Sequence, residues 1–466
     1  MTAGNGGQIS AKGAGSISIT GTNNGFGGAG IINSGIKMQI TNCAVSAGNS
    51  GQLYADTSND INIGSNSATI EIGDGGTAIT NSGMETCITN CHLTAGDSGQ
   101  LYATSFSGTI SIGSTVEGSV AMRNGGFGIN TSGNATHLSA CVIYAGSSGQ
   151  IYAHANDTVY IAYDGYVTIG FGGAGIAYTG DDAHVADCTV VAGNGGQVHT
   201  QAGASRIAYK ASFSSSLTVG MGGAGITIQG DTAHVTACSI TGGSSGNIQA
   251  QSTSFTNIGV DGGLANLTGG GDAIYAQSAS NAVITDCLLT TSDGGSFLGT
   301  LTQGTVSGAD GGNGIICDNT RNVTISNCLI KKTGDGGNGA GPGSFGGNGG
   351  VGILVNANCS DTQISNCTIT KTGVGGTGAT AGVGGHGIVS SGASGQINNN
   401  TIAYTGTANG LAISCVDSVA PAVYSNFAHN IAASPAYYLI TGAAVDSTTG
   451  TAFGLGTDRL ANIHKP

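Results

Sequence analysis

Short runs of alternating apolar and polar residues recur along most of this chain. The segment 314–330, GIICDNTRNVTISNCLI, holds two such runs with a polar turn between them. Alternation with a period of two is typical of β-strands, and runs of about four or five residues fit short strands. No amphipathic stretch long enough for a crossover helix separates the runs, which argues against βαβ units. We therefore predict an all-β chain of short strands.

The strand pattern belongs to a longer repeat. A glycine motif, first seen as GFGGAGI at 25–31, occurs nine times and ends at Ile31, Ile79, Ile129, Ile176, Ile226, Ile274, Ile315, Ile353 and Ile388. Successive motifs lie 35 to 50 residues apart, yet a second signature, such as ITNC or ISNC, follows each isoleucine after only 12 to 14 residues. The short inner segment is therefore the stacked framework of a solenoid, and the remainder tolerates changes of length.

Two of these framework segments carry a resemblance to a known group. NVTISNCLIKKTG at 322–334 and DTQISNCTITKTG at 361–373 resemble the repeats of right-handed parallel β-helices, the pectate-lyase-like superfamily. The resemblance covers roughly residues 20–415. It implies a right-handed parallel β-helix, and it says little about function because this fold hosts lyases, hydrolases, adhesins and phage tailspikes.

The register of a β-helix predicts an inward cysteine ladder. In VTISNCLI, Val323, Ile325, Cys328 and Ile330 point inward, and Asn327 occupies a bend. The equivalent cysteines form one column: Cys43, Cys91, Cys141, Cys188, Cys238, Cys287, Cys328 and Cys367, with Asn400 in the ninth place. One cysteine per repeat at one inward position fits neither a disulfide framework nor a zinc site, so we expect reduced core thiols.

The bends before the ladder cysteines need residues that tolerate a left-handed backbone. These positions hold Asn42, Asn90, Asp187, Asp286, Asn327 and Asn366, whereas Ala140 and Ala237 interrupt the series. We place the glycine motif where the chain turns back into the first strand of each repeat. There we expect positive φ angles and close backbone approach between coils.

The other half of each early repeat has its own pattern. AGNSGQLYA at 47–55 returns at 95–103 and 145–153 in similar form, and it fades into glycine-rich loops towards the C-terminus. This half forms either a second coil of about 24 residues or a long lateral arm on a single coil. The arm is favoured, because shrinking the segment leaves the framework intact.

Two outward columns are candidates for chemistry. Cys87, His137, His184 and His234 precede consecutive ladder cysteines by four residues, and stacked imidazoles could bind a transition metal or titrate near neutral pH. The alternative is a solvated face without a metal. Tyr54, Tyr102 and Tyr152, followed by His199, form the second column, which serves cross-rung packing, a subunit interface or glycan stacking.

Composition and charge narrow the functional classes. The chain has 88 glycines, 4 prolines, 8% charged residues and a net charge of −13, and its basic residues are too dispersed for a nucleic-acid site. No apolar run is long enough for a membrane span, no signal peptide is visible and no cofactor motif stands out. Arginines are sparse, and Asp181–Asp182 and His386 lie about 200 residues apart in the sequence. We predict no enzymatic activity, with a polysaccharide lyase or hydrolase as the remaining enzyme class.

The two ends of the chain differ. Residues 1–415 form the predicted β-helix, and 416–466 lose the glycine motif and form a capping or docking segment. The chain begins within the repeat register, because Met1–Gly4 aligns with Leu93–Gly96, so we expect the first rung to stack on another molecule. The main hypothesis is a structural β-solenoid that self-assembles head to tail into an extracellular fibre or surface layer. The alternative is a glycan-binding or host-binding rod, such as an adhesin or a tailspike-like trimer.

Overall fold

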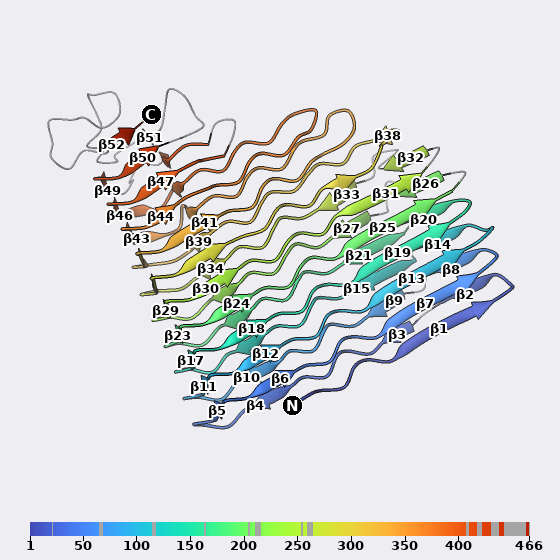
Figure 1. Ribbon diagram of the computed structural model, residues 1–466, viewed down its shortest axis with the longest axis horizontal. Coiled ribbons are helices and arrows are strands. Elements are labelled where there is room, and N and C mark those ends of the chain that lie inside the picture. The colour runs from blue at the N-terminus through green and yellow to red at the C-terminus, as the bar shows by residue number, and fades with distance from the viewer. Residues whose placement is uncertain are drawn as a thin grey trace.

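The computed structural model describes the whole chain except residues 21, 65–68, 114–117, 163–164, 204–205, 210–215, 253–254, 259–263, 407–409, 417–421, 430–437, 442–462 and 466. The described residues form a right-handed parallel β-helix without helices, which confirms the predicted fold. Each repeat makes one flattened coil, and successive coils stack in register, as Leu53 against Leu101 shows. The second half of the repeat is therefore a lateral arm of the same coil (Figure 1).

Three sheets surround the half of the coil that carries the ladder cysteines. The first has eleven strands: β4 (Ile31–Asn33), β10 (Ile79–Asn81), β16 (Ile129–Thr131), β22 (Ile176–Tyr178), β28 (Ile226–Ile228), β34 (Ile274–Gln277), β39 (Ile315–Asp318), β42 (Ile353–Val355), β45 (Ile388–Ser390), β48 (Ile413–Val416) and β51 (Tyr438–Thr441). The second has ten: β5 (Gln39–Thr41), β11 (Cys87–Thr89), β17 (His137–Ser139), β23 (His184–Ala186), β29 (His234–Thr236), β35 (Val283–Thr285), β40 (Thr324–Ser326), β43 (Ser360–Ser365), β46 (Ala393–Asn398) and β49 (Ala422–Tyr424). The third has eleven: β6 (Ala44–Ser46), β12 (His92–Thr94), β18 (Val142–Tyr144), β24 (Thr189–Val191), β30 (Ser239–Thr241), β36 (Leu288–Thr290), β41 (Leu329–Lys332), β44 (Thr368–Ile369), β47 (Thr401–Ala403), β50 (Phe427–His429) and β52 (Ile463–Lys465).

Three further sheets form the end of the lateral arm. The first has seven strands: β1 (Gln8–Gly13), β7 (Gln52–Thr57), β13 (Gln100–Ser105), β19 (Gln150–Ala155), β25 (Gln197–Ala202), β31 (Ile248–Ser252) and β37 (Phe297–Leu298). The second also has seven: β2 (Ile17–Ile19), β8 (Ile61–Ile63), β14 (Ile110–Ile112), β20 (Val159–Ile161), β26 (Arg206–Tyr209), β32 (Phe255–Ile258) and β38 (Gln303–Gly304). The third has six: β3 (Thr22–Asn24), β9 (Thr69–Ile72), β15 (Ser119–Met122), β21 (Tyr166–Ile169), β27 (Ser216–Val219) and β33 (Leu264–Leu267).

The coil contains two separate hydrophobic cores. The cysteine core lies between the first three sheets and is lined by residues such as Ile88, Leu93 and the buried ladder cysteines. The arm core lies between the other three sheets and includes Leu53 and Ile61, both fully buried. Inward residues alternate with outward ones along each strand, which is why the sequence shows a period of two.

A bridge of glycine-rich backbone joins the two cores, and we call it the glycine bridge. It consists of outgoing runs, such as 47–51 and 95–99, and returning runs, such as 73–78 and 123–128, drawn without arrows between the strand groups in Figure 1. The amide of Gly76 donates to the carbonyl of Gly48 at 2.9 Å, and the amide of Gly96 donates to the carbonyl of Gly76 at 2.8 Å. The outgoing and returning runs therefore bond to each other as well as to the next coil.

Close approach explains the glycine motif, whereas left-handed backbone does not. A Cβ on Gly75 would lie 1.8 Å from the carbonyl oxygen of Gly96, and one on Gly125 would lie 1.8 Å from that of Gly146. Among the described glycines, positive φ angles occur at Gly64, Gly113, Gly299, Gly304, Gly341, Gly343 and Gly395, all outside the motif. The prediction of positive φ in the motif was wrong, because the two runs face each other across the coil without turning.

The left-handed bends lie before the ladder cysteines, as predicted. Asn42, Asn90, Ala140, Asp187, Ala237, Asp286, Asn327 and Asn366 all have φ between 51° and 56°. The side-chain amide of Asn90 donates to that of Asn42 at 2.6 Å, which links successive bends along the stack. Ala140 and Ala237 adopt the same backbone without this bond, at the strain expected for a residue with a Cβ.

The described part of 416–466 continues the stack. β49 pairs with β46, and β50 pairs with β47, both in parallel. Most of the predicted docking segment lies outside the described residues, so the boundary at residue 415 stays a prediction.

Candidate functional site

The cysteine column lies inside the cysteine core. Cys91, Cys141, Cys188, Cys238, Cys287, Cys328 and Cys367 are each at most 3% exposed, and no disulfide links any cysteine among the described residues. Each thiol also contacts the carbonyl two residues earlier, for example Cys238 Sγ to Thr236 O at 3.2 Å. These thiols fill the bend beside the left-handed residue and satisfy their weak donor.

Neighbouring thiols interact along the column. For Cys188, the hydrogen bond with Cys141 lowers the pKa, but the bond with Cys238 and burial outweigh it and raise the pKa to about 12. The same balance raises the pKa of Cys238, Cys287 and Cys328 to about 12. A thiol with so high a pKa is neutral at physiological pH and is a poor nucleophile. The column is therefore suited to packing.

Cys43 is a correction to the predicted ladder. It stands in the same column as Cys91, and the amide of His92 donates to the carbonyl of Cys43 at 2.8 Å. Its side chain is nevertheless exposed, whereas that of Cys91 is buried. Burial in a solenoid needs a coil on both sides. Among the described residues, β5, which precedes Cys43, pairs only with β11, whereas β6, which follows it, pairs with β12 and is also bridged at Ser46 to Thr2.

Sequence reasoning placed Asn400 in the ninth position of the column but missed Asn426, which extends the column further. Asn400 is 1% exposed in the ninth position, and its Oδ1 accepts from the amide of Cys367 at 2.9 Å. Asn426 continues the column in the same way, because its Oδ1 accepts from the amide of Asn400 at 3.0 Å. The column thus changes from thiols to buried amides. The pairing of INNN with ISNC was the only signal, and it did not reach Asn426.

The tyrosine column is confirmed as a set of register neighbours on the outward face of β7, β13, β19 and β25. Ring centroids of Tyr54 and Tyr102 are 4.8 Å apart, and those of Tyr102 and Tyr152 are 4.9 Å apart, with interplanar angles of 4°. His199 extends the stack from Tyr152 at 4.9 Å. The hydroxyl of Tyr54 donates to Gln52 Oε1 at 2.8 Å, and Tyr102 and Tyr152 bond Gln100 and Gln150 likewise.

Of the uses expected for the tyrosines, this geometry favours packing between coils over stacking on a sugar ring. Tyr102 has a ring on each side, so neither of its faces is open to a sugar ring, which needs an exposed aromatic face. Desolvation, followed by the neighbouring tyrosines, raises the pKa of Tyr102. The column therefore packs coil on coil, and its use as an interface or as a glycan strip stays a hypothesis.

The histidine column lies on the second sheet of the cysteine core, in the predicted register. Cys87 pairs with His137, His137 with His184, and His184 with His234. The imidazoles stack with centroids 4.7 and 4.8 Å apart, and His184 Nε2 lies 3.2 Å from Asp182 Oδ1. Nitrogen lone pairs of parallel stacked rings do not converge on one point, as a metal ion at about 2.0–2.1 Å from each would require. Among the residues that the structure describes, no group of three His, Cys, Asp or Glu could hold a metal ion.

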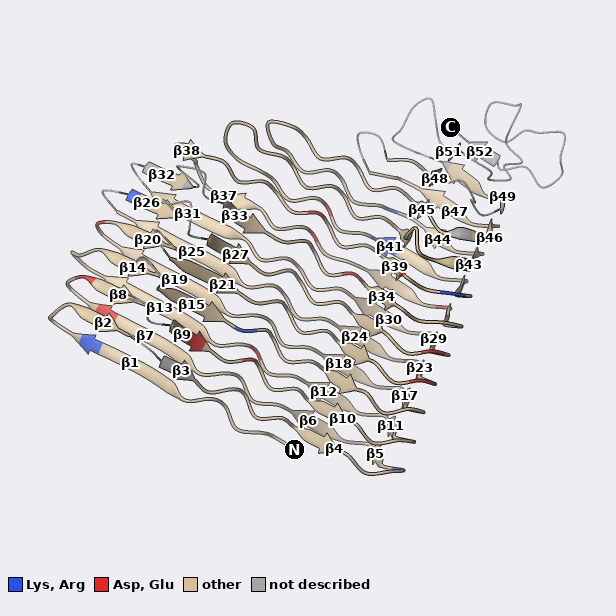
Figure 2. Cartoon of the chain, turned by 180° about the vertical axis from the view of Figure 1, so that it is seen from behind, with Lys and Arg blue, Asp and Glu red and all other residues tan. Residues whose placement is uncertain are grey.

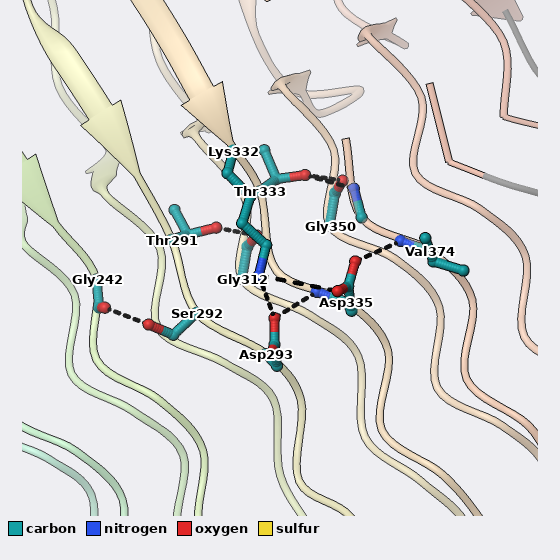
Figure 3. Close-up of polar contacts among 11 residues, drawn as sticks. Gly242, Thr291, Ser292, Asp293, Gly312, Lys332, Thr333, Asp335, Gly350 and Val374 are labelled. Atoms are coloured by element: carbon teal, nitrogen blue, oxygen red, sulfur yellow. Dashed lines mark hydrogen bonds and ion pairs between the residues drawn. The ribbon is translucent and has the colours of Figure 1, made fainter. Parts of the chain in front are cut away.

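A third cluster surrounds Lys332 on the outgoing side of the glycine bridge (Figure 3). A register shift between β36 and β41 pairs Thr290 with Lys332, and Lys332 Nζ lies 3.0 Å from Asp293 Oδ1 and 3.8 Å from Asp335 Oδ2. The Asp293 carboxylate also accepts from the amide of Asp335 at 2.9 Å. The ammonium occupies the place a cation would take, so this cluster joins coils by an ion pair.

The same use of side chains runs along the whole glycine bridge. Asn49 Oδ1 accepts from the amide of Asp97 at 2.9 Å, and Asp97 Oδ1 accepts from the amide of Ser147 at 2.7 Å. On the returning side, Asp74 and Asn124 accept in the same way from the next coil. Figure 2 shows how sparse the charges are, and the ion pairs Lys12–Asp56 and Lys37–Glu85 also join successive coils.

The residues weighed for enzyme chemistry do not come together. Asp181 Oδ1 accepts from the amide of Asp231 at 3.0 Å, at a corner of the cysteine core. His386 lies in a returning run of a much later coil, where its Nδ1 accepts from the amide of Leu411 at 2.8 Å and desolvation lowers its pKa. Both side chains serve coil-to-coil bonds, and the prediction that the protein is not an enzyme stays a prediction.

The arm sheet of β19, β25 and β31 carries a shallow surface hollow. Its outer wall is formed by Tyr152, His154, His199, Gln201, Gln249 and Gln251. These six side chains come from two adjacent outward columns on three successive coils.

No family model and no curated protein matches the chain. Among solved structures, it is similar to the Dettilon tailspike protein at 12% identity and a TM-score of 0.17, over 77% of this chain and 64% of the tailspike chain. A score of this size does not establish a shared fold. Among the described residues, no helix is long and apolar enough to cross a membrane.

Proposed function

We propose that this protein is a structural rod whose copies join head to tail into an extracellular fibre or surface layer, and that it has no enzymatic activity and no cofactor. The observation that carries the proposal is the use of outward side chains. Tyrosine rings, asparagine and aspartate oxygens and surface ion pairs bond their counterparts one coil away. Groups committed to their neighbours in this way stiffen a stack and leave little for catalysis.

End-to-end joining is supported by the in-register parallel pairing of successive coils, which a coil of a second copy could continue. Cys43 is exposed and Ile31 is only partly buried, whereas their counterparts Cys91 and Ile79 are 3% and 0% exposed. Another coil in the same register, supplied by a second copy, would bury the edge of the first coil and pair its strands. We also place the chain with the pectate-lyase-like β-helices, on the support of its bend residues and its inward column.

Electron microscopy of the purified protein at rising concentration tests the proposal. We expect fibres with a constant axial repeat, and loss of fibres when residues 416–466 are deleted. Changing Cys43 to Arg, which places a charge on the edge of the first coil, should also block growth. The matched control Thr104→Arg, on an outward face of a middle coil, should leave it intact. Discrete monomers or trimers at every concentration would refute head-to-tail assembly.

A further inference from the structure

The hollow on the arm sheet combines an inner row that bonds from coil to coil with an outer row of exposed polar side chains. It lies on the outward face of β19, β25 and β31, and its lining contains imidazoles, side-chain amides and one phenol, with no carboxylate, ammonium or guanidinium. His154, Gln201 and Gln251 are exposed, while Tyr152, His199 and Gln249 are half-buried. The wall of the hollow is therefore mostly carbon, and polar groups of both the exposed and the half-buried side chains border it.

The hollow forms where the arm sheet ends. The next strand, β37, has only two residues, and its pairing with β31 stops at Gln249 and Leu298. Gln251 therefore has no paired residue on the following coil, and its side chain is exposed. The aromatic stack also ends here, because the position after His199 in this column is Gln249.

The inner row of the hollow is held in place by hydrogen bonds. His199 Nδ1 lies 2.9 Å from Gln249 Oε1, and His199 Nε2 lies 2.8 Å from Gln197 Oε1. The ring of Tyr152 stacks on His199 from the other side. This row is a rigid floor, whereas the outer row of His154, Gln201 and Gln251 is exposed to solvent.

We propose that this hollow binds an uncharged glycan. Amides and imidazoles supply donors and acceptors together, as the hydroxyl groups of a sugar require, and the carbon wall suits the C–H faces of a pyranose ring. The absence of charged side chains in the lining disfavours acidic sugars, phosphate and metal ions. The site is independent of end-to-end assembly, because it lies on the flank of the stack.

A glycan array probed with the full-length protein tests the site. We expect neutral oligosaccharides to be retained in preference to sialylated or sulfated ones. Calorimetry with a retained glycan should then show at least tenfold weaker binding for Gln251→Ala and for Gln201→Ala. The matched control is Thr104→Ala, which alters the same outward column one coil before His154. Its affinity should stay within twofold of the parent, and circular dichroism should show that all three variants are folded. Retention of acidic glycans only, no retention of any glycan, or equal loss in Thr104→Ala would each overturn the assignment.

Discussion

Replacing one bridge glycine should separate two coils that the structure holds in backbone contact. A Cβ on Gly99 would lie 1.7 Å from the carbonyl oxygen of Gly51 and 2.5 Å from the Ile72 side chain. Carbon and oxygen must move apart by at least ~1 Å to reach a tolerable contact. Neither neighbour is the free end of a flexible chain, since one is backbone and the other belongs to the arm core.

The magnitude follows from the contacts that must give way. Overpacking costs about 1–3 kcal/mol. Loss of one or two nearby backbone hydrogen bonds adds about 0.5–1.5 kcal/mol each. We expect Gly99→Ala to lower the local opening free energy by about 3 kcal/mol, which corresponds to roughly 100-fold faster amide exchange. In a repeat protein the effect should stay in the adjacent coils.

Gly7→Ala is the matched control. Gly7 occupies the equivalent position in the first coil, where a Cβ would meet nothing within 4 Å. Because its φ lies outside the left-handed region, alanine should be neutral or stabilise the fold by about 0.4–1 kcal/mol. Hydrogen exchange with mass spectrometry on peptides spanning 47–57 and 95–105 measures both variants. Unchanged exchange in Gly99→Ala, or an equal effect in both, would refute the close-packed bridge.

Three further predictions address individual columns. Hydrogen bonds along the thiol column together with burial raise the pKa of Cys188 and Cys238 from 9.0 to about 12. Their contribution to stability is therefore fully present below pH 9 and should be lost as the pH rises from 9 to 12, which unfolding followed by far-UV circular dichroism at each pH would measure. A flat stability up to pH 12 would contradict this prediction. Desolvation raises the pKa of Asp272 from 3.8 to about 6, so the ionised carboxylate is disfavoured in the folded protein at neutral pH. Asp272→Asn should therefore stabilise the protein by about 1–2 kcal/mol at pH 7 and hardly at pH 4. A variant that is destabilised at pH 7 would count against this. Tyr102→Ala removes two ring contacts and should lower the free energy of unfolding in urea by about 1–2 kcal/mol. Tyr54→Ala, which removes one tyrosine neighbour, should lower it by about half as much. Equal losses in the two variants would argue against stacking.

The repeated framework was readable from sequence because it depends on local pattern. The spacing between Ile79 and Cys91 predicted the coil, and Asn90 predicted the left-handed bend that the structure contains. The inward column followed from the same alternation. These features recur in every coil, so the pattern shows each of them several times over.

Features that depend on neighbouring coils were not readable. The exposure of Cys43 depends on the coil beside it, and the hollow beside Gln251 depends on the length of β37, one coil away. The motif glycines were expected to supply unusual backbone angles, but Gly75 instead leaves room for Gly96. Asp97 accepts a hydrogen bond from the amide of Ser147 on the next coil, a role that the sequence pattern did not indicate.

The central claim is that each repeat is one flattened coil whose lateral arm stacks on the arm of the next repeat. The test uses a background in which the accessible thiols are removed by Cys43→Ala and Cys87→Ala. The pair Asp97→Cys and Ser147→Cys is then introduced. These two positions lie on adjacent coils of the bridge, because the amide of Ser147 donates to Asp97 Oδ1 at 2.7 Å. Mild oxidation should link this pair, and mass spectrometry should find no link between Asp97→Cys and Ala121→Cys. A link from position 97 to position 121, with none to 147, is the result expected for coils of about 24 residues, and it would contradict the account.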